Sequence, residues 1–148
     1  MKILILNGPN LNLLGNREPD IYGSLSLEQI YEEIINKFPR HEFEFFQSNI
    51  EGELINKIQN VPATYDALII NPGGYSHTSV AIRDALESTD KIKIEVHLSN
   101  IFSREEFRQK SLTASACNGL ISGFKQFSYL AAVYLIELIA DSSASHKP

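Results

Sequence analysis

Short apolar runs alternate with segments of helical spacing along most of the chain, and this alternation is the strongest restriction on the fold. Strands are predicted at residues 3–6, 42–47, 67–70, 92–98 and 118–122. Helices are predicted at 25–38, 53–58, 78–87 and 129–140, with a short charged helix from Ser103. Ser26 followed by Gln29 predicts a capping box at the first helix. Strictly alternating strands and helices predict a parallel sheet covered by helices on both faces.

The 148 residues suit one domain with a substantial core. Five parallel strands in a chain of this size predict an α/β, flavodoxin-like, doubly wound sheet with strand order 2-1-3-4-5. We expect residues 1–140 to form this single domain and 141–148, which are small and polar, to form a flexible tail. A ligand would lie at the carboxyl ends of the strands, where strands one and three diverge.

Composition argues against several classes of partner. The formal net charge of −5 disfavours nucleic-acid binding, which needs a basic surface. No apolar run approaches the roughly 20 residues that span a bilayer, and the first residues lack a signal-peptide pattern, so we expect no membrane partner. A single cysteine, Cys117, cannot form an intramolecular disulfide and suits the reducing cytoplasm, the expected location.

Polar loops follow directly on the predicted strands. The first strand leads to Asn10 and then to Arg17 and Tyr22, and the third leads to Asn71 and His77. Because carboxyl ends of parallel strands meet at one edge of the sheet, these groups should converge with the end of the fourth strand. The sequence therefore predicts a site at this edge.

The fourth strand carries a candidate general acid. Glu95 and His97 are two residues apart in a strand, so their side chains leave the same face. A carboxylate beside an imidazole favours the protonated ring and fixes its orientation. The pair therefore suits proton donation, and a hydrogen-bonded histidine that only closes the sheet edge is the alternative.

A candidate general base lies on the first loop. Arg17 is five residues from Tyr22, and a nearby guanidinium stabilises a phenolate. Gly15 and Gly23 at the loop ends would let the loop open and close as a lid. A surface arginine beside a packing tyrosine is the alternative.

The remaining motifs point to proton chemistry without a cofactor. Phosphate-binding and dinucleotide fingerprints are missing from the sequence, as are a Gly-x-Ser-x-Gly elbow and a convincing set of metal ligands. Arg104 and Arg108 are one helical turn apart, which suits binding of a carboxylate or polyol as well as plain solvation. One base, one acid and a polar cradle would serve β-elimination of water next to a carbonyl.

At these residues the chain closely resembles the type II 3-dehydroquinate dehydratase (3-dehydroquinase) family. The resemblance covers nearly the whole chain with its spacing kept. It is carried by Leu6-Asn7-Gly8-Pro9-Asn10-Leu11-Asn12-Leu13-Leu14-Gly15, Arg17-Glu18-Pro19, Tyr22-Gly23, Gln47-Ser48-Asn49, Asn71-Pro72-Gly73, His77-Thr78-Ser79, Arg83-Asp84-Ala85, Glu95-Val96-His97-Leu98-Ser99-Asn100 and Arg104-Glu105-Glu106-Phe107-Arg108.

The resemblance implies reversible trans-dehydration of 3-dehydroquinate to 3-dehydroshikimate through an enolate, with no cofactor and no metal. By its place in the motif, Tyr22 would be the base that takes the C2 proton, with Arg17 stabilising the phenolate and the transition state. His97, oriented by Glu95, would protonate the departing hydroxyl. The pathway would be shikimate biosynthesis of aromatic amino acids, with quinate catabolism as the alternative.

The resemblance also implies substrate-binding roles. Asn10 would hold a water at the enolate oxygen, and the backbone amides of Leu98 and Ser99 would bind the carboxylate. The substrate hydroxyls would be held by Asn71, His77 and Arg108, and the lid would be formed by Arg17, Tyr22 and Arg104. Asp84 would reach a neighbouring subunit's site, in a dodecamer built as a tetramer of trimers.

Two other classes of protein remain alternatives. A flavodoxin-like signalling module of the receiver type needs an acidic residue at the end of the third strand, where this chain has Asn71. In a purely structural oligomer, Arg17 and His97 would have no functional role. Both alternatives explain the polar loops less well than an enzyme does.

Overall fold

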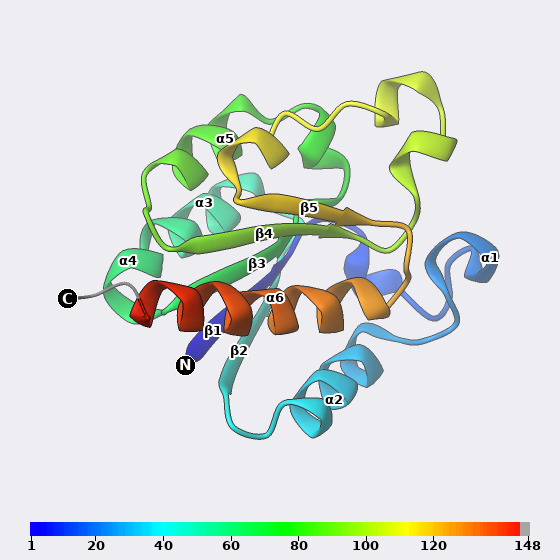
Figure 1. The fold of residues 1–148 in the computed structure, drawn as a ribbon. Coiled ribbons are helices and arrows are strands. Elements are labelled where there is room, and N and C mark those ends of the chain that lie inside the picture. Colours follow the sequence, from blue (N-terminus) through cyan, green and yellow to red (C-terminus); the bar gives the residue numbers. More distant parts are fainter. Residues whose placement is uncertain (146–148) are drawn as a thin grey trace.

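A five-stranded parallel sheet forms the middle layer of the protein in the computed structural model, which describes residues 1–145 (Figure 1). The strands follow the order β2-β1-β3-β4-β5, so the predicted sheet and its order are confirmed. The strand bounds are β1 Lys2–Asn7, β2 Glu42–Gln47, β3 Ala67–Asn71, β4 Ile92–His97 and β5 Gly119–Ser122.

Helices cover both faces of the sheet (Figure 1). One face packs against α2 (Leu27–Lys37) and α6 (Phe127–Ala144), and the other packs against α3 (Glu51–Gln59), α4 (Val61–Thr64) and α5 (Val80–Glu87). Successive residues of the central strands contribute to opposite cores, because side chains alternate along a strand. The two buried cores therefore clamp β1 and β3 between helical layers.

Short helical turns shape the loops at the carboxyl edge of the sheet. The helix α1 (Pro19–Tyr22) lies between β1 and α2. The remaining turns are 3₁₀ helices: η1 Leu11–Leu13, η2 Gly73–His77, η3 Ile101–Ser103, η4 Glu106–Arg108 and η5 Ala114–Ala116. Most of these turns follow strand ends, so they carry the polar loops of the candidate site.

Local capping signals in the sequence hold in the structure. The Ser26 hydroxyl accepts from the backbone amide of Gln29 at 3.2 Å, and the Gln29 side chain accepts from the Ser26 amide at 2.9 Å. The predicted capping box of α2 is therefore confirmed. Ser79 likewise caps α5 by accepting from the Ile82 amide at 2.9 Å. Both caps satisfy amides that a helix start leaves without partners.

The prediction of a short charged helix from Ser103 is wrong. The chain instead forms η3 and η4, separated by extended backbone at Arg104. Asn100 explains the difference, because its side chain accepts from the Phe102 amide at 3.1 Å and its carbonyl accepts from the Ser103 hydroxyl at 3.0 Å. Such local hydrogen bonds compete with a regular helix.

The predicted helix end at residue 140 is also wrong. The helix α6 continues to Ala144, because no glycine or proline between 141 and 145 ends it, and the hydroxyls of Ser142 and Ser143 donate to the carbonyls of Leu138 and Ile139 one turn earlier. Residues 141–144, expected in a flexible tail, are therefore helical. The last three residues of that predicted tail, 146–148, lie outside the described residues.

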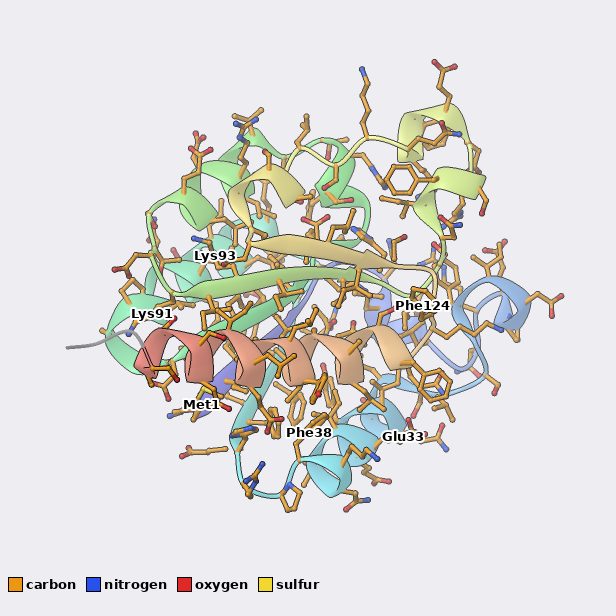
Figure 2. The ribbon with its side chains drawn as sticks, viewed as in Figure 1. Met1, Glu33, Phe38, Lys91, Lys93 and Phe124 are labelled. Atoms are coloured by element: carbon orange, nitrogen blue, oxygen red, sulfur yellow. The ribbon has the colours of Figure 1, made fainter. Side chains whose placement is uncertain are left out.

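The helix α6 is more apolar than the sequence analysis allowed for. Within residues 1–145 it alone is long and apolar enough to cross a membrane by length and composition, with a mean hydropathy of 1.3 over 18 residues. Its buried side, which includes Tyr129, Val133 and Ile136, packs on the sheet, and side chains fill the space between the two (Figure 2). Only 28% of this 18-residue window is buried, so much of the apolar surface of α6 faces away from the sheet.

A buried hydrogen-bond network joins α6 to the ends of the two central strands. The Tyr129 hydroxyl donates to Asn7 Oδ1 at 2.5 Å and accepts from Asn71 Nδ2 at 3.1 Å. Asn7 and Asn71 are paired in the register of β1 and β3, and Asn7 also donates to the Tyr31 hydroxyl at 2.9 Å. The network therefore links both polar loops to the core.

We expect Tyr129→Phe to lower the free energy of unfolding by about 1–3 kcal/mol, because Asn7 and Asn71 would each lose a buried partner. Tyr134→Phe is the matched control, since Tyr134 lies exposed on the same helix and should change stability by less than about 0.5 kcal/mol. Urea unfolding at one protein concentration measures both values. Equal stability of the two variants would contradict the structural role of the network.

Candidate active site

A cavity of about 160 Å³ opens at the carboxyl edge of the sheet, at the ends of β1, β3 and β4. Every predicted site residue except Glu95 and Asp84 lines it, namely Asn10, Arg17, Tyr22, Asn71, His77, His97, Leu98, Ser99, Arg104 and Arg108. Parallel strands ending at one edge bring these distant segments together. The structure thus gathers the residues, while their individual roles stay predictions.

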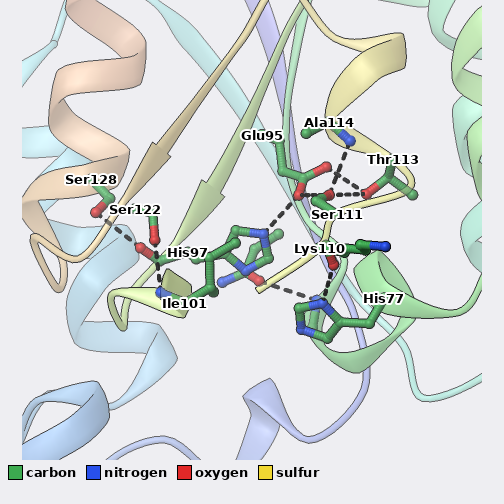
Figure 3. Close-up of polar contacts among 12 residues, drawn as sticks. His77, Glu95, His97, Ile101, Lys110, Ser111, Thr113, Ala114, Ser122 and Ser128 are labelled. Carbon is green, nitrogen blue, oxygen red and sulfur yellow. Dashed lines mark hydrogen bonds and ion pairs between the residues drawn. The ribbon is translucent and has the colours of Figure 1, made fainter. Parts of the chain in front are cut away.

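A carboxylate–imidazole pair lies at the end of β4. His97 Nε2 is 2.7 Å from Glu95 Oε1, and both side chains leave the same face of the strand (Figure 3). Glu95 is 0% exposed and His97 only 5% exposed. Because an ionised carboxylate only accepts, Nε2 carries the proton of this hydrogen bond. The other ring nitrogen, Nδ1, is then the one that can serve a ligand.

A second imidazole lies beside the first. The rings of His77 and His97 are nearly parallel, with centroids 6.3 Å apart and planes 20° apart. His77 Nδ1 lies 2.6 Å from the carbonyl oxygen of Lys110, and since a carbonyl only accepts, Nδ1 carries the proton. A neutral His77 ring therefore offers Nε2 as an acceptor, which suits a hydroxyl of a ligand.

Two guanidinium groups approach Tyr22. Arg104 Nη1 donates to the Tyr22 hydroxyl at 2.8 Å, and the Arg17 guanidinium carbon lies 4.6 Å from the centroid of the Tyr22 ring. The sequence pointed to Arg17 as the partner because it is close in the chain, whereas Arg104 is 82 residues away. Tyr22 is therefore placed between two cations, and its role as a base stays a prediction.

Arg104 and Arg108 do not share the helix face that their spacing predicted, because extended backbone separates Arg104 from η4. Both guanidinium groups still line the cavity. Arg108 Nε lies 3.1 Å from Glu105 Oε2, an ion pair on the rim. The cavity is therefore rich in cations, which suits an anionic ligand.

The loops that follow β1 and β3 are in direct contact. The Gly8 amide donates to the Asn71 carbonyl at 2.8 Å. A Cβ atom at Gly8 would lie 2.3 Å from the carbonyl oxygen of Pro72, far inside van der Waals contact. Gly8 is therefore required where the two loops meet.

The loop that carries Arg17 and Tyr22 has glycines with positive φ at both ends. Gly15 and Gly23 each have φ of +92°, a conformation that other residues rarely adopt. An open depression of about 620 Å³ adjoins the cavity between α1, η3 and the turn before α6. The loop therefore borders open space, and its movement as a lid stays a prediction.

Asp84 and two hydroxyl residues lie outside the cavity. Asp84 is exposed on α5, and its predicted contact with a neighbouring subunit stays a prediction.

Ser111 and Thr113 both donate to Glu95 and were missed by the sequence analysis. No local pattern could have found them, because they reach Glu95 across 16 and 18 residues.

Other reactive groups do not join the site. Burial raises the pKa of the Cys117 thiol to about 12, so it stays protonated and is a poor nucleophile at neutral pH. Within residues 1–145, no three or more His, Cys, Asp or Glu side chains are arranged to hold a metal ion.

Comparisons with known proteins agree with this geometry. The sequence model of the family "Dehydroquinase class II" matches residues 1–137. A 3-dehydroquinate dehydratase of Aliarcobacter butzleri is 50% identical over 147 residues, which cover 97% of this chain and 90% of the relative. A 3-dehydroquinate dehydratase of Helicobacter pylori is 49% identical over 151 residues, with the same coverage of both chains.

Solved structures show the same likeness. The type II dehydroquinase of Butyrivibrio crossotus superposes with a TM-score of 0.90 at 47% identity, covering 93% of this chain and 97% of that one. The type II dehydroquinase of Propionibacterium acnes gives a TM-score of 0.87 at 37% identity, covering 92% and 96%. The chain therefore belongs to the class II dehydroquinase family.

Proposed function

We propose that the protein is a 3-dehydroquinate dehydratase, a hydro-lyase that removes water from 3-dehydroquinate to give 3-dehydroshikimate. Membership of the class II dehydroquinase family supports the activity. The observation that carries the mechanism is the arrangement around one cavity of a tyrosine with two guanidinium partners and a histidine with a buried carboxylate partner. In this proposal the tyrosine is the base and the histidine is the acid of one elimination.

The first step of the proposed mechanism is proton abstraction by Tyr22. The phenolate takes the C2 proton, and the electrons of the C2–H bond form an enolate with the neighbouring carbonyl. Arg104, which donates to the Tyr22 oxygen, and Arg17, which lies over the ring, stabilise the phenolate by their charge. A water held by Asn10 would hydrogen-bond to the enolate oxygen.

The second step is loss of the C1 hydroxyl. The enolate electrons return to form the C1–C2 double bond, the C1–O bond breaks, and His97 delivers the proton that makes the leaving group water. Glu95 accepts from His97 Nε2 and so keeps the ring oriented, with Nδ1 available as the donor. The two steps need no oxidant and no further reactant.

The remaining cavity residues are proposed to hold the substrate. The backbone amides of Leu98 and Ser99 would bind its carboxylate, which the nearby arginines also attract. The hydroxyls would be bound by Asn71, His77 and Arg108. For Asn71 this fits its burial at 3% exposure and its fixed orientation, since its Oδ1 accepts from the Gly73 amide at 3.1 Å.

We further propose a dodecamer, a tetramer of trimers, in which Asp84 completes a neighbouring subunit's site. Exposure of Asp84 on α5, outside its own chain's cavity, is consistent with contact to another chain. We place the enzyme in the cytoplasm and in the shikimate pathway to aromatic amino acids. Quinate breakdown, the alternative, would use the same reaction and the same site.

The activity is tested by the rise in ultraviolet absorbance that accompanies formation of the conjugated enone from 3-dehydroquinate, with a chelator present. We expect turnover by the wild-type protein and a loss of about 10²-fold or more in Tyr22→Phe, which lacks the base. Tyr134→Phe, on the exposed side of α6, is the control and should keep full activity. Absence of turnover by the folded wild type would refute the proposed function.

Arg17→Ala should lower kcat by about tenfold or more, because it removes a cation that lies 4.6 Å from the centroid of the Tyr22 ring and is proposed to stabilise charge in the transition state. Steady-state kinetics at one pH measure the loss. Arg40→Ala, at an 85% exposed side chain far from the cavity, is the control. An unchanged kcat in Arg17→Ala would exclude this role.

The role of Asp84 is tested by mixing two inactive variants. Asp84→Ala and Tyr22→Phe should each lose most activity alone. Refolded together, they should regain part of it, because some sites would combine an intact Tyr22 from one chain with an intact Asp84 from its neighbour. The measurements are kcat of the mixture and its mass by light scattering. A mixture no more active than the average of the two variants would contradict the shared site.

A further inference from the structure

Residues 110–113, which we call the strap, pass close to both imidazoles of the site (Figure 3). The Lys110 carbonyl accepts from His77, and the hydroxyls of Ser111 and Thr113 donate to Glu95, the partner of His97. Three residues of the strap, Lys110, Ser111 and Thr113, thus contact one histidine directly and the other through its carboxylate. The sequence analysis assigned no role to this segment.

The strap is itself firmly held. The Leu112 amide donates to the carbonyl of Ser76 at 2.7 Å, which ties the strap to the residue before His77. The Ser111 hydroxyl accepts from the Ala114 amide at 3.0 Å at the start of η5. Thr113 is 0% exposed. The geometry of the strap is therefore set by the fold on both sides.

Glu95 receives three side-chain hydrogen bonds in a fully buried position. Its Oε1 accepts from His97 Nε2 and from the Ser111 hydroxyl, each at 2.7 Å, and its Oε2 accepts from the Thr113 hydroxyl at 2.5 Å. A buried carboxylate is costly unless such donors compensate its charge. The two hydroxyls therefore restrict the rotation of the Glu95 carboxylate under His97.

The strap also distinguishes His77 from His97. His77 donates Nδ1–H to a neutral carbonyl, whereas His97 donates Nε2–H to a carboxylate, so the two rings have chemically different partners. With centroids 6.3 Å apart, two imidazolium rings would also repel each other.

We propose that the strap positions both histidines for opposite tasks: Ser111 and Thr113 fix Glu95 under His97, the proposed proton donor, and the Lys110 carbonyl fixes His77 with its Nε2 directed to a substrate hydroxyl. Ser111 and Thr113 are thus positioning residues for the acid. The assignment of donor and acceptor roles rests on the proposed function, whereas the positions of the ring protons do not.

Thr113→Val tests the proposal, because valine keeps the shape of threonine and removes the hydroxyl. We expect kcat to fall about tenfold or more while KM changes less than about twofold, since the loss concerns proton delivery and not substrate binding. Thr113→Ser, which keeps the hydroxyl, is the matched control and should retain most activity. Unchanged kcat in Thr113→Val, or an equal loss in Thr113→Ser, would overturn the role of the hydroxyl.

A second measurement does not depend on turnover. Imidazole ¹H–¹⁵N spectra of the substrate-free protein should show His77 protonated on Nδ1 and a His97 Nε2–H protected from exchange with water. The protection should fall in a Ser111→Ala/Thr113→Val double variant that circular dichroism shows to be folded. A His77 proton on Nε2, or unchanged protection in the double variant, would overturn the proposal. Because no substrate is present, failure of the wild type to convert 3-dehydroquinate would refute only the proposed function.

Discussion

The hydroxyl of Tyr129, buried between Asn7 and Asn71, is the interaction on which the rest of the site depends. Burial raises the pKa of Tyr129 well above its usual value, so the hydroxyl stays protonated and donates to Asn7. Buried amides need partners, and here one hydroxyl from α6 serves two of them. The last helix thereby fixes the strand ends from which the loops at β1 and β3 depart.

Much of the fold follows from local patterns. The five strand positions and the capping box of α2 are readable because buried strands are short apolar runs and helix starts need side-chain acceptors. The strand order follows from strict alternation and size. The segment 101–108 was misread, because local hydrogen bonds of Asn100 outweigh average propensity there. The end of α6 was misread, because the apolar pattern ends before the helix does.

The site is predictable as a set of residues and much less so as a set of contacts. Parallel strands bring their carboxyl ends to one edge, so the residues of the cavity could be named from the sequence. The hydrogen bond from Arg104 to Tyr22 and those from Ser111 and Thr113 to Glu95 depend on how distant loops pack. Spacing along the chain carries no information about such packing.

The close approach of Gly8 to Pro72 has a consequence for how such a protein can change over evolutionary time. Because no side chain fits at Gly8, a bulkier residue at that position requires a matching shift of the backbone at Pro72 in the other loop. The two loops therefore behave as one inherited unit. The segment that carries Arg17 and Tyr22 can change more easily to accept a different substrate. The glycines at its ends, Gly15 and Gly23, lie farther from neighbouring atoms than Gly8 does.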